Sequence, residues 1–359
     1  MRPPKASQIL VFLLTALYGV LPYGGYSQES DFLALQTNLI KLYKEHASAV
    51  VRVNVGYEDL DENGKPSNFK LISSGFFISD TGRILTNSTA LPKGIRIWIE
   101  KDGLSYVAEL IGYDSKTGIG LLQVINLPKT FSYISLAHDN PPPPISTLVL
   151  TITSPLDFKP TPALGMINGF ESNFFDDSFP FTYSRISISL SDGETGSPVL
   201  DLSGNLVGIT VGNIPQVRSS YIVPFKALKK IVKDILKDGK VHYGTIPVTF
   251  AERPDPLRGS KQIYISSIIP NSSAEKAGLK VGDILHSIRG ANIQSKEDIR
   301  NLVFHSKIGD FLIVEIKRNE GVLDFAIPVE KPLVVKPAAF VEPRPEPTEE
   351  PLLPDVPTL

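Results

Sequence analysis

Between Val50 and Val223 the chain is a series of short apolar segments separated by turns, and this pattern most constrains its fold. Glycine, proline, asparagine and aspartate lie between the segments, and helical periodicity is largely absent. Such spacing is typical of an all-β barrel or sandwich domain. The predicted strands are residues 49–55, 71–78, 95–99, 105–111, 120–125, 147–153, 182–190 and 206–211.

Amphipathic helices are predicted on either side of this β region. Residues 31–46 have a helix-forming composition, and residues 225–237 give the clearest helical periodicity, with Gly239 as the stop. A basic amphipathic helix can lie on a membrane surface, but packing on its own domain is our interpretation. The predicted buried stripe consists of Phe225, Leu228, Ile231, Val232, Ile235 and Leu236.

Residues 241–331 form a second predicted unit of α+β type. A strand at 263–269 precedes a short helix that ends at Gly278, and a second helix at 296–306 begins after Ser295 as N-cap. Strands at 311–317 and 323–329 complete the unit.

Both ends of the chain differ in composition from the two units. Residues 1–27 place basic residues before a short apolar run and small residues, the layout of a signal peptide removed after Ser27. An uncleaved anchor is the alternative, and either implies export. Residues 332–359 are rich in proline and glutamate and predict a disordered spacer. A ligand for a proline-reading partner is the other interpretation of this tail.

Composition excludes several classes of site. The net charge of -2 gives no reason to expect nucleic acid as a partner. The absence of cysteine excludes disulfides, thiol catalysis and cysteine-ligated zinc. No His-x-x-x-His pair occurs, and the acidic runs at 59–62 and 176–177 lack the spacing of a calcium loop. We therefore predict no metal and no cofactor.

The segment 191–200 predicts a functional loop. Gly193 and Gly196 bracket Thr195, and the chain then enters a predicted hairpin with Gly204-Asn205 at its tip. A tight turn of this kind can direct backbone N–H groups into one small space, as in the oxyanion hole of acyl-transfer enzymes.

This loop resembles the nucleophile loop of trypsin-like serine proteases, most closely that of the HtrA family, whose pattern is Gly-Asn-Ser-Gly-Gly-Pro. Segments 74–87, 111–124, 154–167 and 221–224 are similar to further parts of that family's protease domain. Segment 277–283, Ala-Gly-Leu-Lys-Val-Gly-Asp, resembles a PDZ domain. The resemblance implies a mainly β protein, with a trypsin-like double six-stranded β-barrel domain at 28–240 and a PDZ domain at 241–331.

The same resemblance implies a degenerate catalytic site. The positions of the catalytic histidine, aspartate and serine are occupied by Thr89, Gly118 and Thr195, so all three functional groups are absent. Gly193 and Thr195 are interpreted as a remnant of the oxyanion loop. A rebuilt pair of His138 with Ser197 or Ser191 stays open, although no spacing supports it.

A peptide-binding groove is implied in the PDZ unit. Its predicted walls are Thr245, Ile246 and Val248 on one side and Ile299, Leu302 and Val303 on the other. Pro247 stands where the family has glycine and removes an N–H donor, which weakens the expected capture of a peptide carboxylate.

Three functions follow as hypotheses. The first is an exported, periplasmic or envelope-associated pseudoprotease that binds unfolded or C-terminal peptides, or regulates an envelope protein partner. The second is an endopeptidase with a non-standard constellation. The third is a scaffold that docks one fixed partner through the PDZ domain. The family also implies a homotrimer.

Overall fold

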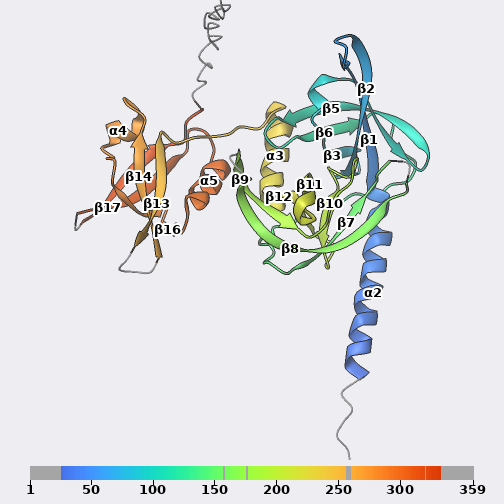
Figure 1. Cartoon of the computed structure of the whole chain (residues 1–359), viewed down its shortest axis with the longest axis horizontal. Helices are drawn as coiled ribbons and strands as arrows, with labels where there is room; N and C mark the ends of the chain where they lie inside the picture. Colours follow the sequence, from blue (N-terminus) through green and yellow to red (C-terminus); the bar gives the residue numbers. More distant parts are fainter. Residues whose placement is uncertain (1–25, 157, 175–176, 256–259, 320, 333–359) are drawn as a thin grey trace, which may run out of the picture.

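The computed structural model describes residues 26–156, 158–174, 177–255, 260–319 and 321–332. The first element is α2 (Tyr26–His46), a helix that extends away from the rest of the molecule (Figure 1) and is followed by the 3-10 turn η1 (Ala47–Ala49). The predicted signal peptide lies outside the described residues apart from its last two, with which α2 begins. No described helix is long and apolar enough to cross a membrane.

The predicted β region forms two closed six-stranded barrels, which confirms the mainly β class. The first barrel has the order β1-β2-β3-β6-β5-β4 and the second β10-β11-β12-β9-β8-β7. Every strand pairs with antiparallel neighbours. The first barrel consists of β1 (Val50–Leu60), β2 (Pro66–Phe77), β3 (Arg83–Asn87), β4 (Gly94–Lys101), β5 (Leu104–Asp114) and β6 (Ile119–Val124).

The strands of the second barrel begin and end at other residues than the sequence pattern predicts. Its strands are β7 (Leu148–Thr153), β8 (Thr161–Phe174), β9 (Asp177–Ile186), β10 (Pro198–Asp201), β11 (Leu206–Ile214) and β12 (Ser219–Pro224). The predicted hairpin tip is confirmed, because Gly204 adopts a φ of 84° and its N–H donates to the Asp201 carbonyl. The strand predicted at 182–190 ends earlier, at Ile186.

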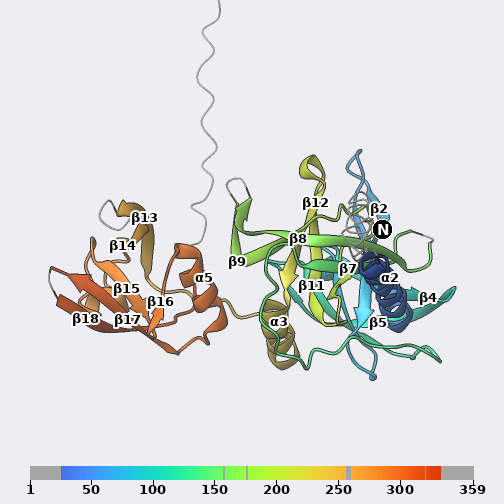
Figure 2. The same cartoon turned by 90° about the horizontal axis from the view of Figure 1, so that it is seen from below.

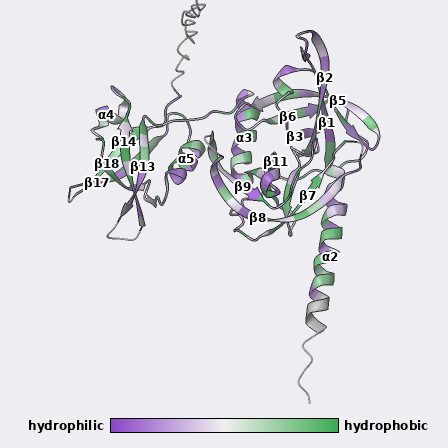
Figure 3. Ribbon diagram, in the orientation of Figure 1, coloured by the Kyte–Doolittle hydropathy of each residue, from purple (hydrophilic) through white to green (hydrophobic). Residues whose placement is uncertain are grey.

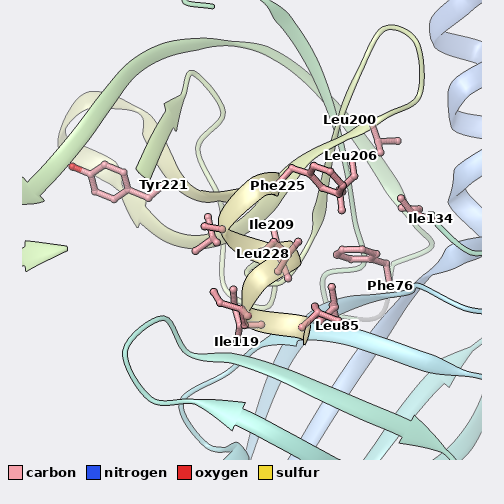
Figure 4. Close-up of a cluster of buried hydrophobic side chains, with 14 of the residues drawn as sticks. Phe76, Leu85, Ile119, Ile134, Leu200, Leu206, Ile209, Tyr221, Phe225 and Leu228 are labelled. Atoms are coloured by element: carbon pink, nitrogen blue, oxygen red, sulfur yellow. The ribbon is translucent and has the colours of Figure 1, made fainter. Parts of the chain in front are cut away.

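A single apolar core joins the barrels to the helix that follows them. Side chains from both barrels, such as Phe76 and Ile209, meet Phe225 and Leu228 in this core (Figure 4). They belong to α3 (Phe225–Asp238), which ends at Gly239 in the left-handed conformation, as predicted. The predicted stripe is buried except for Leu236, which is 43% exposed. α3 therefore packs against the barrels, as interpreted from the sequence.

The third unit is a sheet of order β13-β14-β15-β17-β18 with two helices, and short β16 pairs with β15. α5 begins at the predicted Ser295 cap, where Ser295 and Asp298 form a capping box. β13 is at one edge of the sheet. The elements are β13 (Val248–Asp255), β14 (Ser260–Ile268), α4 (Ser273–Ala277), β15 (Ile284–Ile288), β16 (Ala291–Asn292), α5 (Lys296–His305), β17 (Phe311–Arg318) and β18 (Gly321–Pro328).

The third unit contacts the second barrel through α5, which lies beside β9 (Figures 1 and 2). Asn301 of α5 bonds twice to Thr182 of β9, through its Oδ1 at 2.8 Å and its Nδ2 at 2.9 Å. The rings of Phe181 and Phe304 lie beside one another with centroids 4.4 Å apart. Figure 3 shows that α5 carries both hydrophobic and hydrophilic residues, as an element with one buried and one polar face must.

Candidate functional site

Three loops converge on Asn87 between the two barrels. The Asn87 side-chain amide donates to the Thr117 carbonyl at 2.7 Å, and the Asn87 carbonyl accepts from the Thr195 hydroxyl at 3.4 Å. The N–H of Ser88 donates to the Gly118 carbonyl at 2.9 Å. The structure thus places segments 87–89, 114–118 and 193–197 together, although they are far apart in the sequence.

Hydrogen bonds to neighbouring strands and to Ser191 hold the loop at 193–197. The Ser74 hydroxyl donates to the Gly193 carbonyl, and the Ser74 N–H donates to the Thr195 carbonyl, both at 2.9 Å. The Glu194 carboxylate accepts from the Thr153 hydroxyl at 2.9 Å and from the Ser191 N–H at 2.6 Å. These bonds fix the conformation of the loop, and both Gly193 and Gly196 adopt a φ of 85°.

A side chain at position 118 would meet the Asn87 side chain in this arrangement. A Cβ atom built at Gly118 would lie 2.7 Å from the Asn87 amide nitrogen, and Gly118 itself has a φ of 74°. L-residues with a side chain rarely adopt such a φ. Asn87 is buried and its amide is already bonded to Thr117. The space that a carboxylate at position 118 would need is therefore partly filled.

The three positions interpreted as a degenerate triad differ in their surroundings. Thr89 is exposed, Gly118 is buried, and Thr195 is half-buried with its hydroxyl directed to a backbone carbonyl. His138 stacks on Phe225 with centroids 3.8 Å apart, and its carbonyl accepts from Lys229. His138 therefore packs against residues of α3. That these three positions correspond to a catalytic triad and have lost its chemistry stays a prediction.

A second candidate site is the groove between β13 and α5. It is a pocket of about 460 Å³. Five of the six predicted groove residues line it, namely Thr245, Ile246, Val248, Ile299 and Val303. The sixth, Leu302, does not line the pocket and packs against the core of the third unit, to which Ile299 and Val303 also belong. Ile299 and Val303 are four residues apart and share one face of α5.

The groove is not built by the third unit alone. Phe179 and Pro180 of the second barrel and Lys116 of the first barrel also line it. The Arg300 guanidinium donates from Nη1 to the carbonyls of Ser172 at 2.7 Å and Phe179 at 3.0 Å. This contact fixes the α5 wall of the groove to the second barrel.

Tyr243 connects the two candidate sites. Its hydroxyl donates to the Asp114 carboxylate at 2.6 Å, and Asp114 also accepts from the Thr117 hydroxyl at 2.6 Å. The Lys116 ammonium lies 4.3 Å from the centroid of the Tyr243 ring. Burial, and then the negative charge of Asp114, raises the pKa of the Tyr243 phenol. Tyr243 lines the groove, while Thr117 and Gly118 belong to the converging loops.

Among the described residues, no group of three or more histidine, aspartate or glutamate side chains is placed to hold a metal ion.

Comparisons with known families agree with this architecture. The model of the trypsin-like peptidase domain matches residues 73–209, and the model of the PDZ domain matches residues 242–329. Among solved structures, an HtrA-type protease AlgW with tripeptide has a TM-score of 0.66 at 20% identity, covering 81% of this chain and 96% of that chain. The serine endoprotease from Yersinia pestis has a TM-score of 0.56 at 22% identity, covering 81% and 97%. These likenesses show the fold.

Curated relatives are serine endoproteases of the periplasm. The periplasmic serine endoprotease DegP of Escherichia coli (strain K12) is 24% identical over 268 residues, 71% of this chain and 56% of that protein. A probable periplasmic serine endoprotease, DegP-like, of Marinomonas sp. (strain MWYL1) is 28% identical over 264 residues, covering 69% and 54%. The chain spans about half the length of the curated relatives it matches.

The fold and the site therefore define a trypsin-like peptidase domain followed by a PDZ domain. In this order of domains the chain is similar to the HtrA-type proteases among the solved structures and to the DegP-type endoproteases among the relatives.

The sequence did not predict that residues of the barrels line the groove. Phe179, Pro180 and Arg300 carry no pattern that signals a contact between domains. Asp114 lies in segment 111–124, and its spacing from Thr117 is typical of a side chain that caps a turn. That spacing could have drawn attention to Asp114, but not to its bond with Tyr243.

Proposed function

We propose that this chain is an exported protein of the cell envelope that binds extended peptide segments in the β13–α5 groove and does not cleave them. The observation that carries the proposal is the pairing of an open peptide groove with converging loops that hold Thr89, Gly118 and Thr195. The clients are unfolded proteins or peptide segments, and the compartment is the periplasm, in keeping with the names of the relatives.

The proposal of lost catalysis is supported by chemistry. A serine protease needs a base to take the proton of its nucleophile and an acid group to orient that base. The Thr195 hydroxyl instead donates to the Asn87 carbonyl, which cannot act as such a base. Losing even one triad member leaves only about 10³–10⁴-fold acceleration over water.

The proposal of peptide binding is supported by the groove. β13 is an edge strand, and an extended peptide can add to such an edge while its side chains enter an apolar groove. Ile246, Ile299 and Val303 supply the apolar walls. Pro247 lacks one of the N–H groups that would hold a terminal carboxylate, so internal segments are the favoured ligands.

The first test compares cleavage and binding in one preparation. Fluorescein-labelled, unfolded casein should bind the protein and stay intact, and a serine-directed phosphonate should not label Thr195 or Ser197. The Val303→Glu variant should lose binding, whereas Lys317→Glu on β17, exposed and outside the groove lining, should keep it. If the parent protein cleaves casein and Thr195→Ala abolishes that cleavage, the endopeptidase hypothesis is established instead.

The range of ligands separates a client binder from a scaffold. A pulldown from an envelope extract should recover many unfolded proteins if the protein holds clients. One stoichiometric partner would assign it the scaffold function. A homotrimer, implied by the family alone, is tested by the mass of the purified protein in solution.

A further inference from the structure

The groove has an open edge next to the point where the described chain ends. β13 pairs with β14 on one side only within the described residues, and its other edge faces α5. An unpaired edge presents N–H and C=O groups that bind an added strand. We propose that residues 342–348 of the chain's own C-terminal segment bind this edge and occupy the groove until a client displaces them. The inference rests on the proposed function of the groove.

The chain leaves the described fold at the mouth of the groove. Glu330 exchanges two backbone hydrogen bonds with Thr245, at 2.8 and 2.9 Å, and Pro332 lines the pocket. β13 has eight residues and is therefore about 27 Å long. Residue 342 follows Pro332 by enough chain to reach about 33 Å. Segment 342–348 can thus lie antiparallel to β13, with residue 348 near Thr249 and residue 342 near the far end of the strand, without strain in the connection.

Charge favours this segment as the occupant. Lys116, Lys296 and Arg300 line the groove, and none of them is ion-paired with a carboxylate in the part of the chain described. Glu252, close to the Lys296 backbone, is paired with Lys261. Residues 333–359 are acidic, with Lys336 and Arg344 against Glu342, Glu346, Glu349, Glu350 and Asp355.

The spacing of the prolines fits addition to one edge. Pro343, Pro345 and Pro347 alternate with residues that keep their N–H groups. In an extended strand, alternate residues direct N–H and C=O to the same side. The N–H groups of residues 342, 344, 346 and 348 can therefore all face β13, while the backbone nitrogens of the three prolines are directed away from β13, where the ladder needs no donor. Prolines at mixed spacing would interrupt such a ladder.

Tethering makes this occupancy a form of regulation. A segment linked to its site has an effective concentration in the millimolar range, so a weak contact suffices to fill the groove. A client in solution must compete with it, and its apparent affinity falls by the fraction of time that the groove is filled. Removing the segment should therefore tighten client binding without changing the groove.

The absence of cysteine allows a direct test by crosslinking in the full chain. Thr348→Cys is combined with Thr249→Cys, an exposed position on β13 that lines the groove, and treated with a short bis-maleimide. The control pairs Thr348→Cys with Lys317→Cys on β17, three strands away in the sheet order. The 249–348 pair should crosslink within one chain at least tenfold faster than the control.

Charge variants test the recognition itself. The double change Glu342→Lys and Glu346→Lys should abolish the difference in crosslinking rate between the 249–348 pair and the control pair. About 1 M NaCl should have the same effect, because the Debye length then falls to about 3 Å. Adding Lys116→Glu and Lys296→Glu, two exposed positions that line the groove, to the tail variant should restore this difference. Equal crosslinking of the two pairs at low salt would overturn the inference.

A binding measurement keeps this outcome separate from the proposed function. Labelled, unfolded casein is titrated into the full chain and into a variant that ends at Pro332, a change that leaves every described element in place. Tighter binding by the shortened chain supports occupancy by the tail. Equal binding by both overturns the inference and leaves the proposed function standing, whereas binding by neither overturns both.

Discussion

The bond between Tyr243 and Asp114 gives the sharpest test of how the two domains are joined. Asp114 is 2% exposed and accepts from Tyr243, from the Thr117 hydroxyl and from the Lys116 N–H at 3.3 Å. Tyr243→Phe removes one of these three donors and nothing else. A hydrogen bond to a charged group contributes about 1.5–3 kcal/mol, so we expect a loss of about 2 kcal/mol.

Thermal unfolding measures this loss. For a unit of 150–250 residues, 1 kcal/mol corresponds to about 2–4 °C, so Tyr243→Phe should lower Tm by about 4–8 °C. Tyr264→Phe is the matched control, because no hydrogen bond of its hydroxyl occurs among the described residues and its ring contacts Arg253 at 4.9 Å. The reasoning is refuted if the two variants unfold at the same temperature.

Three further predictions concern pH and the converging loops. Because the pKa of Tyr243 is raised in the folded state, its stabilisation is complete below pH about 10 and falls as pH rises further. Denaturant titrations at pH 9 and 11 should show a steeper loss in the parent than in Tyr243→Phe. Restoring the three family residues with Thr89→His, Gly118→Asp and Thr195→Ser should yield no casein cleavage, because position 118 has a positive φ and meets Asn87; cleavage above the parent's background would contradict this. Gly196→Ala should cost about 3 kcal/mol or more, since its Cβ would lie 2.3 Å from the Ser74 carbonyl, and a denaturant titration no different from that of the parent would refute this.

Local patterns predicted the elements well because each depends on neighbouring residues. The Ser295 cap, the Gly239 stop and the Gly204 turn are all decided by backbone geometry within a few residues. The prediction that Leu236 is buried was wrong, because Leu236 lies at the margin of the α3 stripe, where the neighbouring surface decides exposure. The ends of β8 and β9 likewise depend on pairing between strands.

The site was only partly accessible from sequence. The convergence of the loops at Asn87 follows from the barrel fold, which the resemblance implied. The contact of Asn301 with Thr182 joins residues that are 119 positions apart, and no pattern in either segment encodes it. Contacts of this kind arise when two folded units meet, so a single sequence carries no periodicity that would reveal them.

The Asn87 amide beside Gly118 also bears on the direction in which such a chain can evolve. A carboxylate is gained at position 118 by one codon change only where its place is vacant. Here the Asn87 amide fills part of that place, and the positive φ of Gly118 favours glycine. An aspartate at position 118 would therefore require a second substitution, at position 87. A path of single substitutions then passes through a chain that carries only one of the two changes, which narrows the routes open to this position.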